Sequence, residues 1–121
     1  MELEKLPYSL TVCKTASLRG IDPDSPFFFL GKTDEEISLV CRTEDVPADT
    51  VAREDGWSGF RFRGTLDFSL TGVLSRLASV LAERGIAVFA VSTYNTDYIL
   101  VRSENLDRAL SALAAEGYVI S

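Results

Sequence analysis

Histidine is absent from the 121-residue chain, and its absence excludes many common catalytic groups. Without histidine there is no Ser-His-Asp triad, no Cys-His pair and no imidazole ligand for a metal ion. A general acid or base would have to be Asp, Glu, Lys, Tyr or Cys. The composition therefore favours a protein that is not an enzyme and that holds no metal or other cofactor.

Cysteine is scarce, since Cys13 and Cys41 are the only two in the chain. Two thiols without histidine do not supply the four ligands of a structural zinc site. They could form a redox pair. Free cysteine is among the most buried residue types, so we expect two small core residues in strands.

Long apolar runs and an excess of basic residues are also missing. No stretch approaches the ~18 apolar residues of a membrane span, and residues 1–10 lack the pattern of a signal peptide. With 12 Lys plus Arg against 18 Asp plus Glu, the net charge is −6. Such a surface repels phosphate backbones. We expect a soluble, cytoplasmic protein with neither a membrane nor nucleic acid as partner.

The apolar content is sufficient for a folded domain. Apolar residues make up 46% and charged residues 25% of the chain, which is ordinary for a globular protein. A chain of this length buries roughly two-thirds of the surface that it exposes when unfolded. It therefore needs neither a disulfide nor a metal to fold.

In the second half, a strand pattern is followed by a helix pattern. Residues 57–64 end in alternating Phe and Arg, which predicts a half-buried strand. Apolar residues spaced by three and four from 70 to 81 predict an amphipathic helix. Ser69 or Thr71 could cap this helix, and Gly85 is placed to end it.

Two further strand patterns, a second helix pattern and a last short strand pattern follow. Residues 86–93 form an apolar run typical of a strand in the middle of a sheet. Residues 98–102 predict its hairpin partner. Ser103 caps a second helix that ends at Gly117, and its apolar face holds Leu106, Ala109, Leu110 and Leu113. A short strand at 118–120 completes a strand-helix-strand-strand-helix-strand order.

The first half repeats this order faintly. Strand patterns occur at 8–14, 27–30 and 37–41, but residues 16–25 hold Gly, Pro and Asp in place of a helix. We predict an α+β fold with two ferredoxin-like (βαββαβ) units sharing an antiparallel sheet with helices on one face. The first unit, 1–58, is degenerate, and the second, 59–121, is complete.

Three segments together resemble the ACT domain, a regulatory amino-acid-binding module. They are residues 64–74, 82–89 and 92–101, and the Ser-Thr-Tyr-Asn-Thr-Asp-Tyr string at 92–98 is fairly specific. More narrowly, the chain is similar to the ACT repeats of aspartate kinase and of the arginine-sensing CASTOR proteins. The resemblance is strong over 59–121 and weak over 1–58. It implies an amino acid bound between ACT units, and a homodimer.

The resemblance also implies which residues bind the ligand. The implied set is Ser69, Leu70, Thr71, Gly72, Val73 and Leu74 before and in the first helix, Tyr94, Asn95, Thr96 and Asp97 in the hairpin, and Ser38 and Leu39 from the first half. The family often has Asp-x-Pro-Gly at 69–72. Here Gly72 is kept, but one carboxylate is missing.

Physical chemistry supports part of this set independently. A helix N-terminus attracts a carboxylate through its free N–H groups and dipole, and Gly72 allows a ligand to approach the backbone. Asp97 or Asp67 could pair with an ammonium group. Tyr94 could form an apolar wall.

Structural roles would explain the same residues without a ligand. Ser69 and Thr71 would be helix caps, and Gly72 would permit close packing. Asn95 and Asp97 would form the hairpin turn. By the same reasoning Tyr94 and Tyr98 would pack on the sheet, Asp67 would be a solvated loop carboxylate, and Arg61 and Arg63 would be a solvated face.

Three functions remain open. The first is a non-catalytic regulatory module that binds a small ligand, in particular a free amino acid. The second is a structural or dimerisation domain without a ligand, joined through an exposed sheet edge or face. The third is an enzyme that uses Asp97, Tyr94 or Cys13. The amino acid bound and any protein partner are not specified by the sequence.

Overall fold

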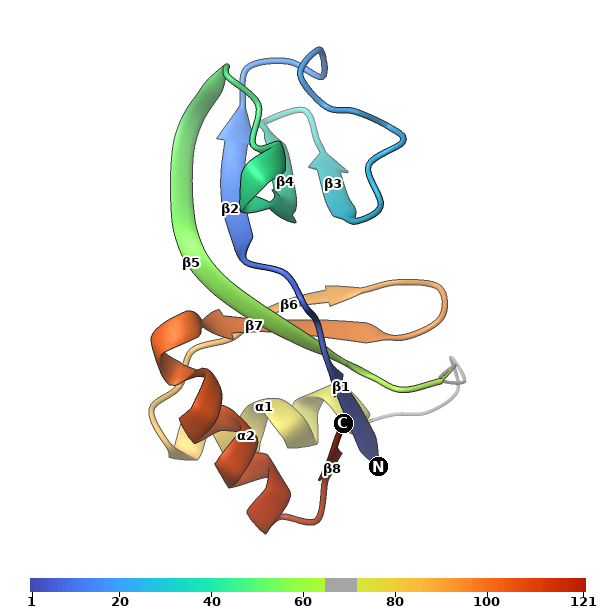
Figure 1. The fold of residues 1–121 in the computed structure, drawn as a ribbon, viewed down its shortest axis with the longest axis vertical. Helices are drawn as coiled ribbons and strands as arrows, with labels where there is room; N and C mark the ends of the chain where they lie inside the picture. The colour runs from blue at the N-terminus through green and yellow to red at the C-terminus, as the bar shows by residue number, and fades with distance from the viewer. Residues whose placement is uncertain (65–71) are drawn as a thin grey trace. The chain divides into compact units, whose positions relative to one another are not determined.

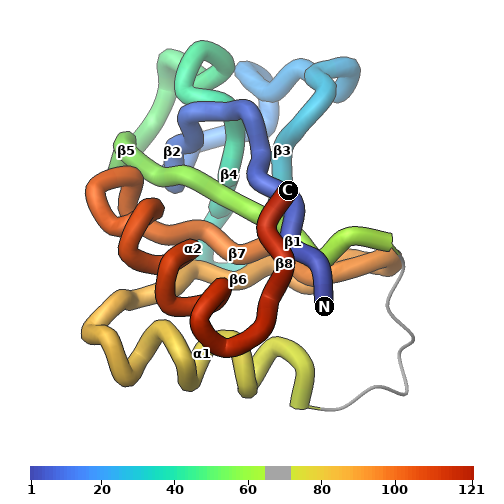
Figure 2. Tube along the Cα trace, turned by 60° about the horizontal axis from the view of Figure 1, so that its bottom comes forward, coloured from blue at the N-terminus to red at the C-terminus, as the bar shows by residue number. Residues whose placement is uncertain are grey.

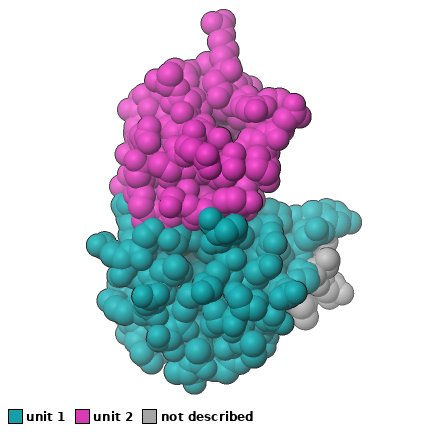
Figure 3. Space-filling model, in the orientation of Figure 1, with its two compact units in different colours: residues 1–7, 58–121 teal, residues 8–57 magenta. Residues whose placement is uncertain are grey.

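The computed structural model describes residues 1–64 and 72–121 (Figure 1). Contacts within the chain divide it into two units, coloured separately in Figure 3. Unit 1 comprises residues 1–7 and 58–121, and unit 2 comprises residues 8–57. The predicted domain boundary between 58 and 59 stays a prediction, but residues 1–7 belong to the contacts of unit 1.

Unit 1 is a sheet with both long helices on one face (Figure 2). Its strands run in the order β8-β1-β5-β7-β6, in which the pairs β1–β5 and β6–β7 are antiparallel and the pair β1–β8 is parallel. The elements are β1 (Glu2–Lys5), the last part of β5 (Thr50–Phe62), α1 (Val73–Glu83), β6 (Phe89–Ser92), β7 (Asp97–Arg102), the 3₁₀ turn η2 (Ser103–Asn105), α2 (Leu106–Ala115) and β8 (Val119–Ile120).

The core of unit 1 lies between the sheet and the two helices. Phe60 and Phe62 of β5 are at most 1% exposed and pack with the buried faces of both helices. The predicted spacing is confirmed, because Leu77 and Leu81 of α1 are buried in this core. The predicted face of α2 is confirmed in the same way.

Both helices end as the glycine positions predict. Gly85 has φ +70°, and its N–H donates to Ala82 O at 3.0 Å while Ile86 N–H donates to Leu81 O at 3.0 Å. This is the Schellman arrangement. Gly117 ends α2 in the same way, with φ +96°.

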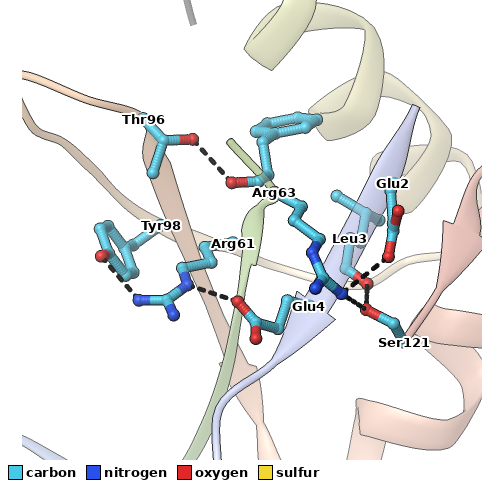
Figure 4. A network of polar contacts seen from close by, with 9 residues as sticks. Glu2, Leu3, Glu4, Arg61, Arg63, Thr96, Tyr98 and Ser121 are labelled. Carbon is cyan, nitrogen blue, oxygen red and sulfur yellow. Dashed lines mark hydrogen bonds and ion pairs between the residues drawn. The ribbon is translucent and has the colours of Figure 1, made fainter. Parts of the chain in front are cut away.

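Strand β1 has no counterpart in the sequence prediction. It lies between β5 and β8, and Leu3 is fully buried in the core. Figure 4 shows the polar side of this contact, where Arg61 Nε donates to Glu4 Oε1 at 2.9 Å and Arg63 Nη1 donates to Glu2 Oε2 at 3.0 Å. Arg61 and Arg63 are therefore not a free solvated face. They bind β1 to β5.

Unit 2 keeps the strand order but not the helices. Its strands run β3-β4-β2-β5, which matches β6-β7-β5-β8 of unit 1 once β1 is set aside. Residues 16–27 contain no helix, as predicted. The elements are β2 (Leu10–Thr15), β3 (Phe28–Lys32), β4 (Ile37–Arg42), the 3₁₀ turn η1 (Thr43–Asp45) and the first part of β5.

The two hairpins repeat at an offset of 60 residues (93 − 33). Thr33 N–H donates to Glu36 O at 2.9 Å, and Thr93 N–H donates to Thr96 O at the same distance. The strands that follow, β4 and β7, each bury three successive residues. The faint repeat in the sequence is therefore a structural repeat.

Several predicted elements differ from the structure. The strand predicted at 57–64 begins at Thr50, because β5 also pairs with β2. The strand predicted at 86–93 shortens to β6, which pairs only with β7 among the described strands, so it is not central. Ile86 accounts for part of the apolar run, because it is buried in the core beyond the end of α1.

Ser103 does not cap α2. The helix begins at Leu106 after the 3₁₀ turn η2, with Asn105 at its N-cap and no side-chain cap hydrogen bond. The Ser103 hydroxyl instead bonds with the Ser58 hydroxyl at 2.8 Å. The α+β class with two ferredoxin-like units is confirmed, the first unit being degenerate. No helix in the described residues is long and apolar enough to cross a membrane.

Candidate functional site

The N-terminus of α1 is open. Gly72 is its N-cap residue, with φ +78°, and Arg76 N–H donates to Gly72 O at 2.9 Å. No atom of the described chain lies within 4 Å of the place where a Cβ on Gly72 would be. Close packing therefore does not explain this glycine within 1–64 and 72–121, whereas its positive φ does.

A cavity of about 500 Å³ adjoins this helix end within unit 1. Its lining comes from α1, from the end of α2 and from the chain beside β8 and β1. The residues are Met1, Gly72, Val73, Arg76, Glu116, Gly117 and Tyr118. Its volume is in the range of small-molecule sites. Its lining includes one acidic residue, Glu116, and one basic residue, Arg76.

Only some of the predicted loop residues can be located. Ser69, Leu70 and Thr71, together with Asp67, lie outside the described residues, as does their proposed capping role. Gly72 and Val73 line the cavity, whereas Leu74 packs partly buried against the core. The structure thus places two of the six predicted loop and helix residues at one cavity.

The predicted hairpin residues divide between turn and strand. Tyr94 is 79% exposed, and Asn95 is exposed beside it in the turn. Thr96 is 6% exposed, and its hydroxyl donates to Phe62 O at 3.0 Å. Asp97 begins β7. Thr96 therefore joins the hairpin to the end of β5, just before the residues that are not described.

Ser38 and Leu39 lie on β4 of unit 2. Leu39 is 1% exposed and packs with Cys13 and Cys41. It also lines a small cavity of about 60 Å³ below residues 20–28. The ligand-binding role predicted for Ser38 and Leu39 stays a prediction.

Both cysteines are core residues, as predicted, with Cys13 4% and Cys41 2% exposed. Burial, with a smaller contribution from the neighbouring Cys13, raises the pKa of the Cys41 thiol to about 12. A protonated buried thiol is a poor nucleophile and a poor metal ligand. Within 1–64 and 72–121, no group of three or more His, Cys, Asp or Glu is arranged to hold a metal ion.

Five cavity residues were missed from the sequence: Met1, Arg76, Glu116, Gly117 and Tyr118. Arg76 looks like any exposed helix residue, and Glu116 precedes the helix-ending glycine. Their proximity results from two helix ends that meet at one edge of the sheet. From the sequence, only the predicted positions of the two helix ends within a βαββαβ unit could have indicated that these residues lie close together.

The family model of the ACT domain matches residues 52–115, which is more than half of the chain. The chain belongs to the ACT domain family. The match covers β5 from Ala52, both helices of unit 1 and the β6–β7 hairpin. The resemblance seen in the sequence over 59–121 is thereby confirmed.

Relatives of this ACT protein include an arginine sensor. The subunit 1 of the cytosolic arginine sensor for mTORC1, from Rattus norvegicus and from Mus musculus, is 29% identical over 119 residues. The match covers 92% of this chain and 36% of the sensor. This chain therefore spans about a third of the length of those relatives.

Solved structures share the fold over nearly the whole chain. Protein Atu0741 from Agobacterium tumefaciens is 32% identical, with a TM-score of 0.86, over 99% of this chain and 91% of that one. The regulatory subunit of aspartate kinase from Thermus thermophilus is 12% identical, with a TM-score of 0.58, over 93% and 95%. The second likeness concerns the fold alone.

Proposed function

We propose that this protein is a non-catalytic regulatory module that binds a free amino acid at the N-terminus of α1. The observation that carries the proposal is the cavity beside Gly72 in the segment matched as an ACT domain. Gly72 exposes backbone there, and a helix N-terminus favours a carboxylate. The names of a relative and of a solved structure, an arginine sensor and a kinase regulatory subunit, support the same role.

The site extends, in this proposal, to the predicted residues beyond the cavity. Ser69, Leu70 and Thr71 lie outside the described residues, and the binding roles predicted for them and for Leu74, Tyr94, Asn95, Thr96 and Asp97 stay predictions. The ligand-binding role predicted for Ser38 and Leu39, in the degenerate unit, stays a prediction of its own. L-Arginine is the first ligand to test, because a 29% identical relative is named as an arginine sensor.

The experiment is thermal unfolding with each of the twenty amino acids at millimolar concentration. A ligand at ~100 times its dissociation constant stabilises the folded state by ~2.7 kcal/mol, which raises Tm by several degrees in a domain of this size. We expect one amino acid, or a chemically related few, to raise Tm. A flat panel up to the solubility limit of each amino acid would overturn the proposal.

Gly72→Val tests whether the shift arises at the α1 end. Its matched control is Gly85→Val, because Gly85 also has a positive φ and open space around its missing Cβ. Both variants lose stability from backbone strain. Only Gly72→Val should lose the response to the amino acid.

A dimerisation domain without a ligand is the second candidate. It is supported by β6, which pairs with β7 alone among the described strands and has Ala90 and Ser92 exposed. An open edge strand pairs readily with another copy. Sedimentation equilibrium should show a dimer that Ser92→Lys weakens and that Ala115→Lys, on the exposed end of α2, does not.

A homodimer is equally compatible with a ligand. We propose that two copies associate, and that the ligand shifts the association only as far as its affinity for the two states differs. Repeating the sedimentation experiment with the amino acid that raises Tm separates the two functions. A dimer that forms in a protein with a flat panel would favour the second candidate.

A further inference from the structure

The outer face of α1 consists mainly of small residues. Ser75, Ser79 and Ala82 are exposed and follow one another at spacings of four and three. They therefore lie on one side of the helix, opposite the buried Leu77 and Leu81. Figure 2 shows α1 at the border of unit 1. Small side chains allow a second helix to approach closely, but a stripe of this kind does not by itself identify a partner.

Two charged residues beside this stripe lie at the ends of α1 that disfavour them. Arg76 is in the first turn, where the helix dipole is positive, and Glu83 is the last residue, where the dipole is negative. No acidic residue in the first turn of α1 and no basic residue in its last turn offsets this pattern. In α2, by contrast, Asp107 lies in the first turn, where a carboxylate is favoured. The charge pattern of α1 is thus unfavourable for the helix alone.

Neither of these charges is paired within the described chain. Arg76 and Glu83 are exposed and make no ion pair or side-chain hydrogen bond within residues 1–64 and 72–121. Arg84, which follows Glu83, lines a groove together with residues of α2. Arg61 and Arg63 differ, since each is held by a glutamate of β1. The outer face of α1 therefore has one unpaired charge of each sign, at opposite ends.

We propose that a second copy of this chain packs against this face, with its α1 antiparallel to the first. Arg76 and Glu83 lie three positions before and four positions after Ser79, or about 4.5 and 6 Å along the helix. A two-fold axis beside Ser79 therefore brings Arg76 of each copy next to Glu83 of the other. Each charge then also lies beside the end of the neighbouring helix that favours it. The pattern that is unfavourable in one helix is favourable in the pair.

The interface names the surface through which two copies associate, and it rests on that part of the proposed function. It does not involve the edge of β6, which supports the dimerisation domain without a ligand. It also requires no bound amino acid. Because Arg76 lines the cavity of unit 1 as well, the second copy lies next to the proposed binding site.

A charge exchange tests the pairing, measured by sedimentation equilibrium of the whole chain from micromolar to millimolar concentration. Arg76→Glu changes both charge pairs of the dimer from attraction to repulsion, and Glu83→Arg does the same. We expect each single variant to raise the dissociation constant of the dimer at least about tenfold. The double variant Arg76→Glu/Glu83→Arg restores opposite charges across the two-fold axis. Its dissociation constant should return close to that of the wild type.

Arg19→Glu and Glu35→Arg provide matched controls. Both residues are exposed in unit 2, and the two substitutions change the net charge by the same amounts as those in α1. Both controls should dimerise as the wild type does. Ser79→Lys places two like charges beside the two-fold axis and should abolish the dimer. Thermal unfolding of each variant checks that it is folded, since all of these positions are exposed.

The outcomes separate this inference from the proposed function. A dimer that both single variants weaken and the double variant restores supports the interface. If the single variants change the dimer no more than the controls do, if the double variant stays as weak as they are, or if only Ser92→Lys weakens the dimer, the interface is wrong and the association stands. A wild type that stays monomeric up to millimolar concentration overturns both. Amino-acid binding is tested separately by the thermal panel.

Discussion

Unit 1 and unit 2 have the same strand order, but among the described residues unit 1 contains two α-helices and unit 2 contains none. In unit 1 the sheet is covered by α1 and α2, which bury a core with Phe60 and Leu113. In unit 2 residues 16–27 and the 3₁₀ turn η1 stand in place of helices, and the buried cluster on that side is small.

The comparison shows what the strands and the helices each provide. Strand order and hairpin register persist in unit 2 with no helix, so the sheet does not need helices for its topology. The cavity of about 500 Å³ in unit 1 is lined by two helix ends, whereas the cavity near Leu39 in unit 2 has a volume of about 60 Å³. We therefore propose the unit with helices as the one that binds the ligand.

The largest expected difference concerns the two cores. Leu113→Ala in unit 1 removes a fully buried side chain between helix and sheet, and we expect a loss of about 3–5 kcal/mol in the free energy of unfolding. Leu39→Ala in unit 2 should cost about 2–3 kcal/mol, because the loop over its small cluster can collapse. Urea unfolding measures both, and equal losses would remove the energetic distinction between the units.

The next effect should be equal in both units. Gly85 in unit 1 and Gly56 in unit 2 have φ +70° and +83°, and neither has an atom of the described chain within 4 Å of a built Cβ. Gly85→Ala and Gly56→Ala should each cost about 1–2 kcal/mol from left-handed backbone alone. If urea unfolding shows that one substitution lowers the free energy of unfolding much more than the other, the surroundings of that glycine contribute to the loss in addition to its φ.

A smaller effect tests how β1 is held in unit 1. Arg61 contacts Glu4 at 2.9 Å, and its Nη1 donates to the Tyr98 hydroxyl at 3.1 Å. Both ends of the ion pair are over a third exposed, so a double-mutant cycle of Arg61→Gln and Glu4→Gln should give a coupling of about 0.5–1 kcal/mol. The coupling should fall in high salt, and a coupling that salt does not change would point to Tyr98 instead.

At neutral pH the smallest effect is expected from the two thiols, which occur only in unit 2. Burial raises the pKa of Cys41 from 9.0 to about 12, so the unfolded chain ionises first as the pH rises. This contribution to stability is complete below pH 9 and is lost between pH 9 and pH 12. Cys41→Ala should flatten this alkaline part of the stability curve, as measured by urea unfolding from pH 7 to pH 11. An unchanged curve would contradict the assignment.

The helices and hairpins were predictable because their signals are local. Apolar spacing gave the buried faces of α1 and α2, and Gly85 and Gly117 marked their ends. Strand β1 was not predictable, since Glu2, Glu4 and Lys5 surround a single buried leucine, and its place depends on β5 and β8.

The candidate site was predictable only in part, for the same physical reason. Gly72 stood out because a glycine at a predicted helix N-terminus leaves the backbone open to a ligand, and the structure adds that its φ is +78°. Arg76, Glu116 and Tyr118 become neighbours only when the two helix ends meet at one cavity. The Ser103 cap failed because a 3₁₀ turn separates it from α2, and no local pattern distinguishes that turn from the helix itself.

The measurement that tests the account most directly is a two-dimensional ¹H–¹⁵N NMR titration of the intact chain with the amino acids of the thermal panel. It observes the backbone of both units in one experiment. We expect the largest changes in amide shift at 72–76 and 116–118 in unit 1, and we expect them to saturate as the amino acid is added. Saturable changes centred in unit 2, with residues 72–76 and 116–118 unmoved, would contradict it.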